Sequence, residues 1–165
     1  MIKLCSLYSG SSGNSVFIAT ERTRILIDAG LSGKKIIEAL SSIGENPAEL
    51  SAILVSHEHS DHIKGVGVLS RKFDIPIYAN EGTWEEMEKK IGPVSTQNKM
   101  YFNTDREFEL GDMSINPFSI PHDASEPVGF NFYINNKKIT NATDLGSISK
   151  ELLAHFEKSD VILLE

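Results

Sequence analysis

Four side chains that commonly bind metal ions lie within one six-residue stretch of the sequence. The stretch directly follows a short apolar run and reads His57-Glu58-His59-Ser60-Asp61-His62. It holds three of the five histidines in the chain. Imidazole and carboxylate ligands together suit zinc, manganese or iron. The pattern therefore predicts a metal site at the end of a strand.

The spacing within this stretch indicates how the ligands are shared. His57 and His59 are two residues apart, so both imidazoles can project to one side of an extended segment. Asp61 and His62 follow where the chain turns into a helix, and can face a neighbouring position. The helical zinc motif of metalloproteases is excluded, because its histidines are four residues apart. The alternative is a polar loop whose histidines bind nothing, and the combination of residue types favours metal binding.

Three further residues are candidates on weaker grounds. His122 follows Pro121 and could be an ordinary loop histidine. Asp144 precedes Gly146 and, taken alone, is more typical of a helix cap or a turn. His155 falls in an expected helix, where a surface or packing role is favoured.

Strands and helices alternate along the chain, which indicates sheets covered by helices. Ser32 is a candidate N-cap for a helix that extends to Gly44, and Asn135–Asn136 is a hairpin signal. The expected strands are 2–7, 16–19, 24–28, 52–56, 75–79, 106–120 with a break at Gly111, 128–134, 138–142 and 161–164. The other expected helices are 62–73, 83–91 and 147–158.

The last expected strand has an unusual character. The run Val161–Leu164 is apolar and would be expected to be buried on both faces, yet only Glu165 follows it. The sequence predicts either a chain that is cut short or a sheet that a partner completes. An exposed apolar sheet edge would favour a homo-oligomer or strand exchange.

Composition sets the class of protein. The length of 165 residues suits one domain, and no apolar run is long enough to span a membrane. The single Cys5 and the lack of a signal-peptide pattern favour a cytoplasmic location. A net charge of −7 argues against a broad basic surface for nucleic acid, although metal ions in a cleft would reverse the local field. Pairs such as Lys89–Lys90 are interpreted as solvated helix faces.

The motif His57-x-His59-x-Asp61-His62 resembles the HxHxDH signature of the metallo-β-lactamase superfamily, and the similarity extends over essentially the whole chain. Asp28 in LIDAG, His122 in PHDA and Asp144 in ATDLG match the other motifs of that superfamily. The segments SGSSGNS, SHEHSDHIKGVGVL and PHDASEPVGF resemble more narrowly its YycJ/WalJ branch, whose members resemble nucleases.

The resemblance implies an α+β fold, the αββα sandwich, with its second half incomplete. Residues 1–165 would form a single domain that lacks the family's C-terminal strands and helices, one metal-ligand histidine among them. His57, His59 and His122 would hold one divalent ion, Asp61 and His62 a second, and Asp144 would bridge both. Zinc is expected first, with manganese or iron as alternatives.

The implied function is a metal-dependent phosphodiesterase, an exonuclease that acts on DNA rather than RNA through a metal-activated hydroxide. Asp61 would also be catalytic, orienting the water and accepting its proton. The alternative is a hydrolase of a small thioester, lactone or β-lactam, because the same site serves both chemistries. A metal-stabilised binding fragment without turnover is a third possibility. Asp28 would support the site without binding metal, and the loop Ser11–Ser15 would either contact phosphate or form a simple tight turn.

Overall fold

Two mixed β-sheets pack face to face, and the computed structural model describes all 165 residues. The first sheet has the order β1-β2-β3-β4-β5-β6, and the second has the order β11-β10-β9-β8-β7. Strands of the first sheet are β1 (Lys3–Tyr8), β2 (Ser15–Ala19), β3 (Arg24–Ile27), β4 (Ala52–Leu54), β5 (Ile77–Ala79) and β6 (Lys99–Tyr101). Strands of the second are β7 (Phe108–Leu110), β8 (Met113–Ser119), β9 (Val128–Ile134), β10 (Lys137–Ala142) and β11 (Val161–Leu164).

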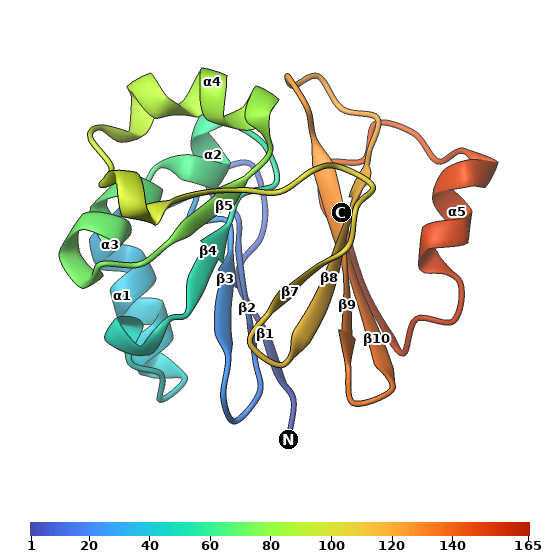
Figure 1. Cartoon of the computed structure of the whole chain (residues 1–165), viewed down its shortest axis with the longest axis horizontal. Helices are drawn as coiled ribbons and strands as arrows, with labels where there is room; N and C mark the ends of the chain where they lie inside the picture. The colour runs from blue at the N-terminus through green and yellow to red at the C-terminus, as the bar shows by residue number, and fades with distance from the viewer.

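Helices cover the outer faces of both sheets (Figure 1). The helices are α1 (Gly33–Ser42), α2 (Ser60–Ile63), α3 (Val66–Phe73), α4 (Glu81–Ile91) and α5 (Lys150–Phe156), with 3-10 turns at Pro47–Glu49 and Thr96–Asn98. α1, α3 and α4 lie against the first sheet, and α5 lies against the second (Figure 1). The layers are therefore the αββα sandwich that the sequence predicts. None of these helices is long and apolar enough to cross a membrane.

The alternation of side chains along each strand divides the core into layers. Phe17 and Leu26 face the helices of the first sheet, whereas their neighbours Ile18 and Ile25 face the second sheet. A third, smaller cluster packs Phe118 and other side chains against α5. The first sheet is buried on both faces, which accounts for its short and almost wholly apolar central strands.

Several predicted elements match the structure closely. Ser32 caps α1 with a hydrogen bond from the Lys35 backbone N–H. Asn135 and Asn136 both have positive φ angles, 49° and 63°, as a two-residue hairpin turn between β9 and β10 requires. The predicted break at Gly111 separates β7 from β8.

The predicted helix 62–73 is wrong as a single element. The chain instead forms α2 and α3, separated at Gly65. The Gly65 backbone N–H donates to Ala29 O at 2.7 Å, and a Cβ at Gly65 would lie 2.5 Å from Leu31 O. The tight packing against residues 29–31 therefore interrupts the helix. The helix expected at 147–158 is shorter than predicted, since Ser149 caps it at α5.

The last strand is exposed, as expected for an open sheet edge. β11 pairs only with β10, to which it runs parallel. Val161, Ile162 and Leu164 are 41%, 44% and 53% exposed, and Leu163 alone packs against the core between the sheets. The burial that such an apolar run would be expected to have is absent here.

Candidate metal centre

The candidate ligands follow four strands that end at the same edge of the sandwich. In the first sheet β3 and β4 run parallel. In the second, β8 and β10 run in one direction because each is antiparallel to β9. The segments after these four strands carry Asp28, the motif from His57, His122 and Asp144 respectively. They meet at the end of the sheets opposite the β9–β10 turn (Figure 1).

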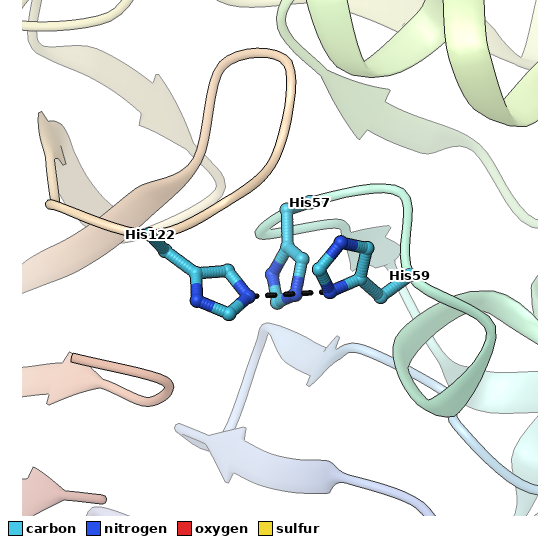
Figure 2. Close-up of side chains that lie close together, drawn as sticks. All are labelled: His57, His59 and His122. Atoms are coloured by element: carbon cyan, nitrogen blue, oxygen red, sulfur yellow. Dashed lines mark hydrogen bonds between the residues drawn. The ribbon is translucent and has the colours of Figure 1, made fainter. Parts of the chain in front are cut away.

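Three imidazoles converge at this edge (Figure 2). One possible ligand atom from each of His57, His59 and His122 lies within 4.8 Å of the others. His122 Nε2 is 3.2 Å from His59 Nδ1, although the two residues are 63 positions apart in the chain. His57 is fully buried, whereas His59 and His122 are partly exposed. The sequence-predicted grouping of these three histidines is thus reproduced as a spatial cluster.

A second group shares His57 and extends deeper. His57, His62 and Asp144 offer ligand atoms that all lie within 4.8 Å of one another. Asp144 Oδ2 is 2.6 Å from His62 Nε2 and 3.8 Å from His57 Nε2. Asp61 Oδ2 lies beside this group, at 3.6 Å from His62 Nε2. The structure therefore brings all six predicted ligands into one region, with Asp144 between the histidines of both groups.

The hydrogen bonds around Asp28 decide which nitrogen of each buried imidazole carries its proton. An ionised carboxylate only accepts, so His62 Nδ1 donates to Asp28 Oδ2 at 2.8 Å. The Ser56 hydroxyl also donates to Asp28 Oδ2, at 2.7 Å. That hydroxyl has one hydrogen, so at 3.0 Å it accepts from His57 Nδ1. When the two rings are neutral, the Nε2 atoms of His57 and His62 both have free lone pairs directed toward the cluster.

Unpaired polar atoms in the cluster test whether a metal ion fits. His57 Nε2 and Asp144 Oδ2 are both buried without a hydrogen-bond partner, since the short contact of Asp144 with His62 is not aligned as a hydrogen bond. Buried polar atoms are normally paired, and leaving one unpaired costs about 1–3 kcal/mol. A nitrogen lone pair and a carboxylate oxygen are ligands for a divalent cation. The donor set therefore fits such an ion.

The electrostatic environment of the two buried histidines agrees with this fit. Burial, followed by the neighbouring histidines, lowers the pKa of His57 to about 2, so its imidazole is neutral. Burial would also lower the pKa of His62, but Asp28 outweighs it and, with Asp144 and Asp61, raises that pKa to about 9. The negative field that holds a proton on His62 would also attract a cation.

Two aspartates of this region have a strained backbone. Asp28 and Asp144 both have φ of 59°, in the left-handed region that is uncommon for residues other than glycine. Such residues cluster at functional sites, where the surrounding contacts maintain them. Asp28 is buried and accepts from both the backbone N–H and the hydroxyl of Ser56, at 2.8 and 2.7 Å. Its predicted supporting role agrees with these contacts.

Sequence reasoning missed three residues that contact the site. Ser56 links Asp28 to His57, as described above. Asn14 Nδ2 lies 3.4 Å from Asp61 Oδ2 and 3.1 Å from His62 Nε2, so its loop does contact the cluster. Glu58 is buried and accepts from the Ser125 backbone N–H at 2.8 Å, in the loop that carries His122. The position of Ser56 and Glu58 on either side of His57 was the available signal.

Residues expected to pack do so. The His155 ring stacks on Phe118, with ring centroids 4.4 Å apart. Trp84 is buried and donates from Nε1 to Met100 O. Tyr78 stacks on Phe108. None of these three side chains belongs to the histidine cluster.

Residues 23–165 match the model of a family described as the β-lactamase superfamily domain. The chain belongs to the metallo-β-lactamase superfamily. It is 44% identical over 160 residues to the exodeoxyribonuclease YycJ of Bacillus anthracis, covering 96% of this chain and 60% of that protein. It is also 44% identical to the exodeoxyribonuclease WalJ of Streptococcus pneumoniae, covering 99% of this chain and 61% of that protein. The chain thus spans about 60% of the length of these curated relatives.

Solved structures of this superfamily share the fold. A metallo-β-lactamase of Cronobacter sakazakii with a HARLDQ motif superimposes with a TM-score of 0.76 at 19% identity, covering 98% of this chain and 76% of that one. The class B3 di-zinc metallo-β-lactamase LRA-12 from an Alaskan soil metagenome gives a TM-score of 0.68 at 16% identity, covering 80% of this chain and 58% of that one. The superfamily and the histidine–aspartate cluster together imply divalent metal ions at this site.

Proposed function

We propose that this chain hydrolyses phosphodiester bonds of DNA and removes nucleotides from a strand end. The observation that carries the proposal is the 44% identity to two exodeoxyribonucleases over 96% and 99% of this chain. That similarity spans a chain whose fold brings all six candidate ligands together. The charge of −7 does not oppose the proposal, because bound cations would make the cleft locally positive.

Two divalent ions, zinc first and manganese or iron as alternatives, would be held by the six residues. His57, His59 and His122 would hold one ion. Asp61 and His62 would hold the other, and Asp144 would contact both. When bound, these ions supply a water activated for attack near neutral pH and stabilise charge on the phosphate oxygens.

The side chains of the site orient the reactants and move the proton. Asp61 is 30% exposed, so its carboxylate can accept the proton of the attacking water and pass it to solvent. Asn14 Nδ2 donates to Asp61 Oδ2 at 3.4 Å and limits the rotation of that carboxylate. The oxygen of the water forms the new bond to phosphorus, and the bond to the departing nucleotide oxygen breaks.

A small-molecule hydrolase is the second candidate. A hydroxyacylglutathione hydrolase of Bdellovibrio bacteriovorus is 44% identical over 87 residues, which cover 51% of this chain and 31% of that protein. The same metal site can attack the carbonyl of a thioester, lactone or β-lactam. The longer similarity to the exodeoxyribonucleases ranks DNA first. We further propose that the protein acts in the cytoplasm and that two copies associate through β11.

The deciding experiment measures metal content and then cleavage. Protein prepared without chelator is analysed by plasma mass spectrometry beside His59→Ala and beside His155→Ala, which removes a histidine outside the cluster. Near two equivalents of metal, lost in His59→Ala and retained in His155→Ala, is the expected result. The loaded protein should then release mononucleotides from linear DNA and leave circular DNA intact. Cleavage of a thioester or β-lactam with no action on DNA would select the second candidate.

A further inference from the structure

A second feature of the active-site edge is a cavity beside Asp61. Its volume is about 440 Å³. Three separate segments line it: the β1–β2 loop, the α2 segment and the C-terminal end of α4. The lining residues are Ser11, Ser12, Gly30, Ser60, Asp61, Ile63, Lys64 and Lys90.

The chemistry of this lining suits an anion. Lys64 and Lys90 are both exposed, and the ion pairs of the structure involve other basic residues. Lys90 Nζ contacts only Glu58 O, at 3.4 Å. Ser11, Ser12 and Ser60 add hydroxyl groups, which can donate to the same anion. Ammonium and hydroxyl donors around one cavity are a recurring way to bind phosphate oxygens.

One carboxylate, that of Asp61, also lines the cavity. It faces away from a simple anion site, because its Oδ2 lies near His62 Nε2 and accepts from Asn14. In the proposed enzyme its charge would be engaged by a cation. Asp61 therefore joins the cavity to the metal centre and makes the two one continuous surface.

Backbone contacts fix the β1–β2 loop against this surface. The Asn14 backbone N–H donates to Asp61 O at 2.8 Å, and the Gly30 N–H donates to Asn14 O at 2.9 Å. The approach at Gly30 is so close that a Cβ there would lie 1.6 Å from Asp61 O. The serines of the loop are thus held at a defined place relative to Asp61.

We propose that this cavity binds a phosphate group of the nucleic-acid substrate, next to the phosphate that is hydrolysed. The proposal rests on the proposed phosphodiesterase function and names a binding subsite for it. Lys64 and Lys90 supply the charge, and the serines supply neutral donors. The bound group is either a backbone phosphodiester or a terminal monophosphate, which present the same oxygens.

The test compares two double variants with equal net charge. Lys64→Gln/Lys90→Gln removes the charges of the cavity, whereas Lys34→Gln/Lys89→Gln removes two exposed lysines outside it. kcat/KM is measured for a single-stranded DNA oligonucleotide and for bis(p-nitrophenyl) phosphate, which is too small to reach both sites. The cavity variant should lose about tenfold on DNA, lose nothing on the small diester, and weaken its salt dependence by about 0.7 per lost contact. Equal losses in the two variants would overturn the proposal.

Further arms separate the two sources and the two proposals. If the loss appears only with a 5′- or 3′-phosphorylated oligonucleotide, the cavity binds a terminal monophosphate; a loss on unphosphorylated DNA as well indicates a backbone phosphodiester. If no phosphodiester is hydrolysed by the unaltered protein, the proposed function fails. The cavity is then judged by fluorescence anisotropy of labelled DNA, where equal affinities of the two variants would refute it.

Discussion

At the scale of single residues, proton positions explain why two histidines with different surroundings present the same atom. Ser56 and Asp28 form a chain of hydrogen bonds that fixes Nδ1 of His57 and of His62 as donors. Both Nε2 atoms are left to bind a cation. Partners of this kind set the tautomer and basicity of metal-binding histidines, and their loss typically weakens metal binding by about 10- to 100-fold.

Asp28→Asn should lower metal affinity without unfolding the protein. Asparagine tolerates the positive φ of position 28, so the backbone is preserved. Its neutral amide replaces a carboxylate that accepts from both His62 and Ser56. We expect an affinity loss of about 10- to 100-fold, measured by competition with a chelating dye, and a folded circular-dichroism spectrum. An unchanged affinity would show that Asp28 does not orient the imidazoles.

Glu58→Ala should weaken the metal that His122 helps to hold. The Glu58 carboxylate accepts from the Ser125 N–H and so anchors the loop that carries His122. We expect metal content to fall from about two equivalents to about one at limiting metal, with an affinity loss of about tenfold. Glu58→Gln retains an acceptor oxygen and should restore binding, and Glu86→Ala removes an exposed glutamate as a control. Failure of the glutamine to restore binding would mean that charge, not anchoring, is the role of Glu58.

At the scale of elements, the sequence predicts strands and caps well because those signals are local. Apolar runs, the Ser32 cap and the Asn135–Asn136 turn depend on neighbours within a few residues. The division between α2 and α3 depends instead on Gly65 packing against a segment more than thirty positions earlier, which periodicity does not reveal. β6 was missed for the opposite reason: its short sequence, Lys99–Tyr101, is partly polar and forms a sheet edge.

Gly30→Ala should disrupt the junction between the β1–β2 loop and the metal motif. The new methyl group would meet the Asp61 carbonyl oxygen at 1.6 Å, so one backbone segment must move. We expect a loss of about 3 kcal/mol in the free energy of unfolding, together with loss of metal. Gly44→Ala is the control, because its φ of 77° is also left-handed but its surroundings are open. That variant should cost about 1–2 kcal/mol and retain metal; equal effects would exclude a specific clash at Gly30.

At the scale of the whole molecule, metal binding should stabilise the fold. The ligands come from segments after β4, β8 and β10, so a bound ion crosslinks both sheets. At a free metal concentration of one hundred times Kd, the stabilisation is about 2.7 kcal/mol. For a domain of this size that corresponds to a fall in Tm of roughly 5–10 °C when a chelator is added. His59→Ala should show little chelator dependence, and an equal shift in that variant would place the stabilising ion elsewhere.

The site was more predictable than its supports, and the reason is chemical. His57, His59, Asp61 and His62 lie together in the sequence, and their residue types announce metal binding. His122 and Asp144 were assigned through the family resemblance, because each is a single residue without a local pattern. Ser56 and Asn14 act through contacts that only the folded chain creates. The cavity lysines were interpreted as solvated, since nothing in the sequence places Lys90 beside Lys64.

The open edge of the second sheet should drive association of two copies. β11 has an unpaired side, and Val161, Ile162 and Leu164 are exposed on it. Exposed apolar edge strands pair readily with other strands, and a charged residue at the edge blocks such pairing. We expect light scattering to show a concentration-dependent dimer, and Ile162→Lys/Leu164→Lys to convert it into a monomer. Val68→Lys, which charges an exposed apolar residue on α3, should leave the dimer intact. A monomer at all working concentrations would refute association through β11, whereas a dimer that survives the edge variant would place the contact on another surface.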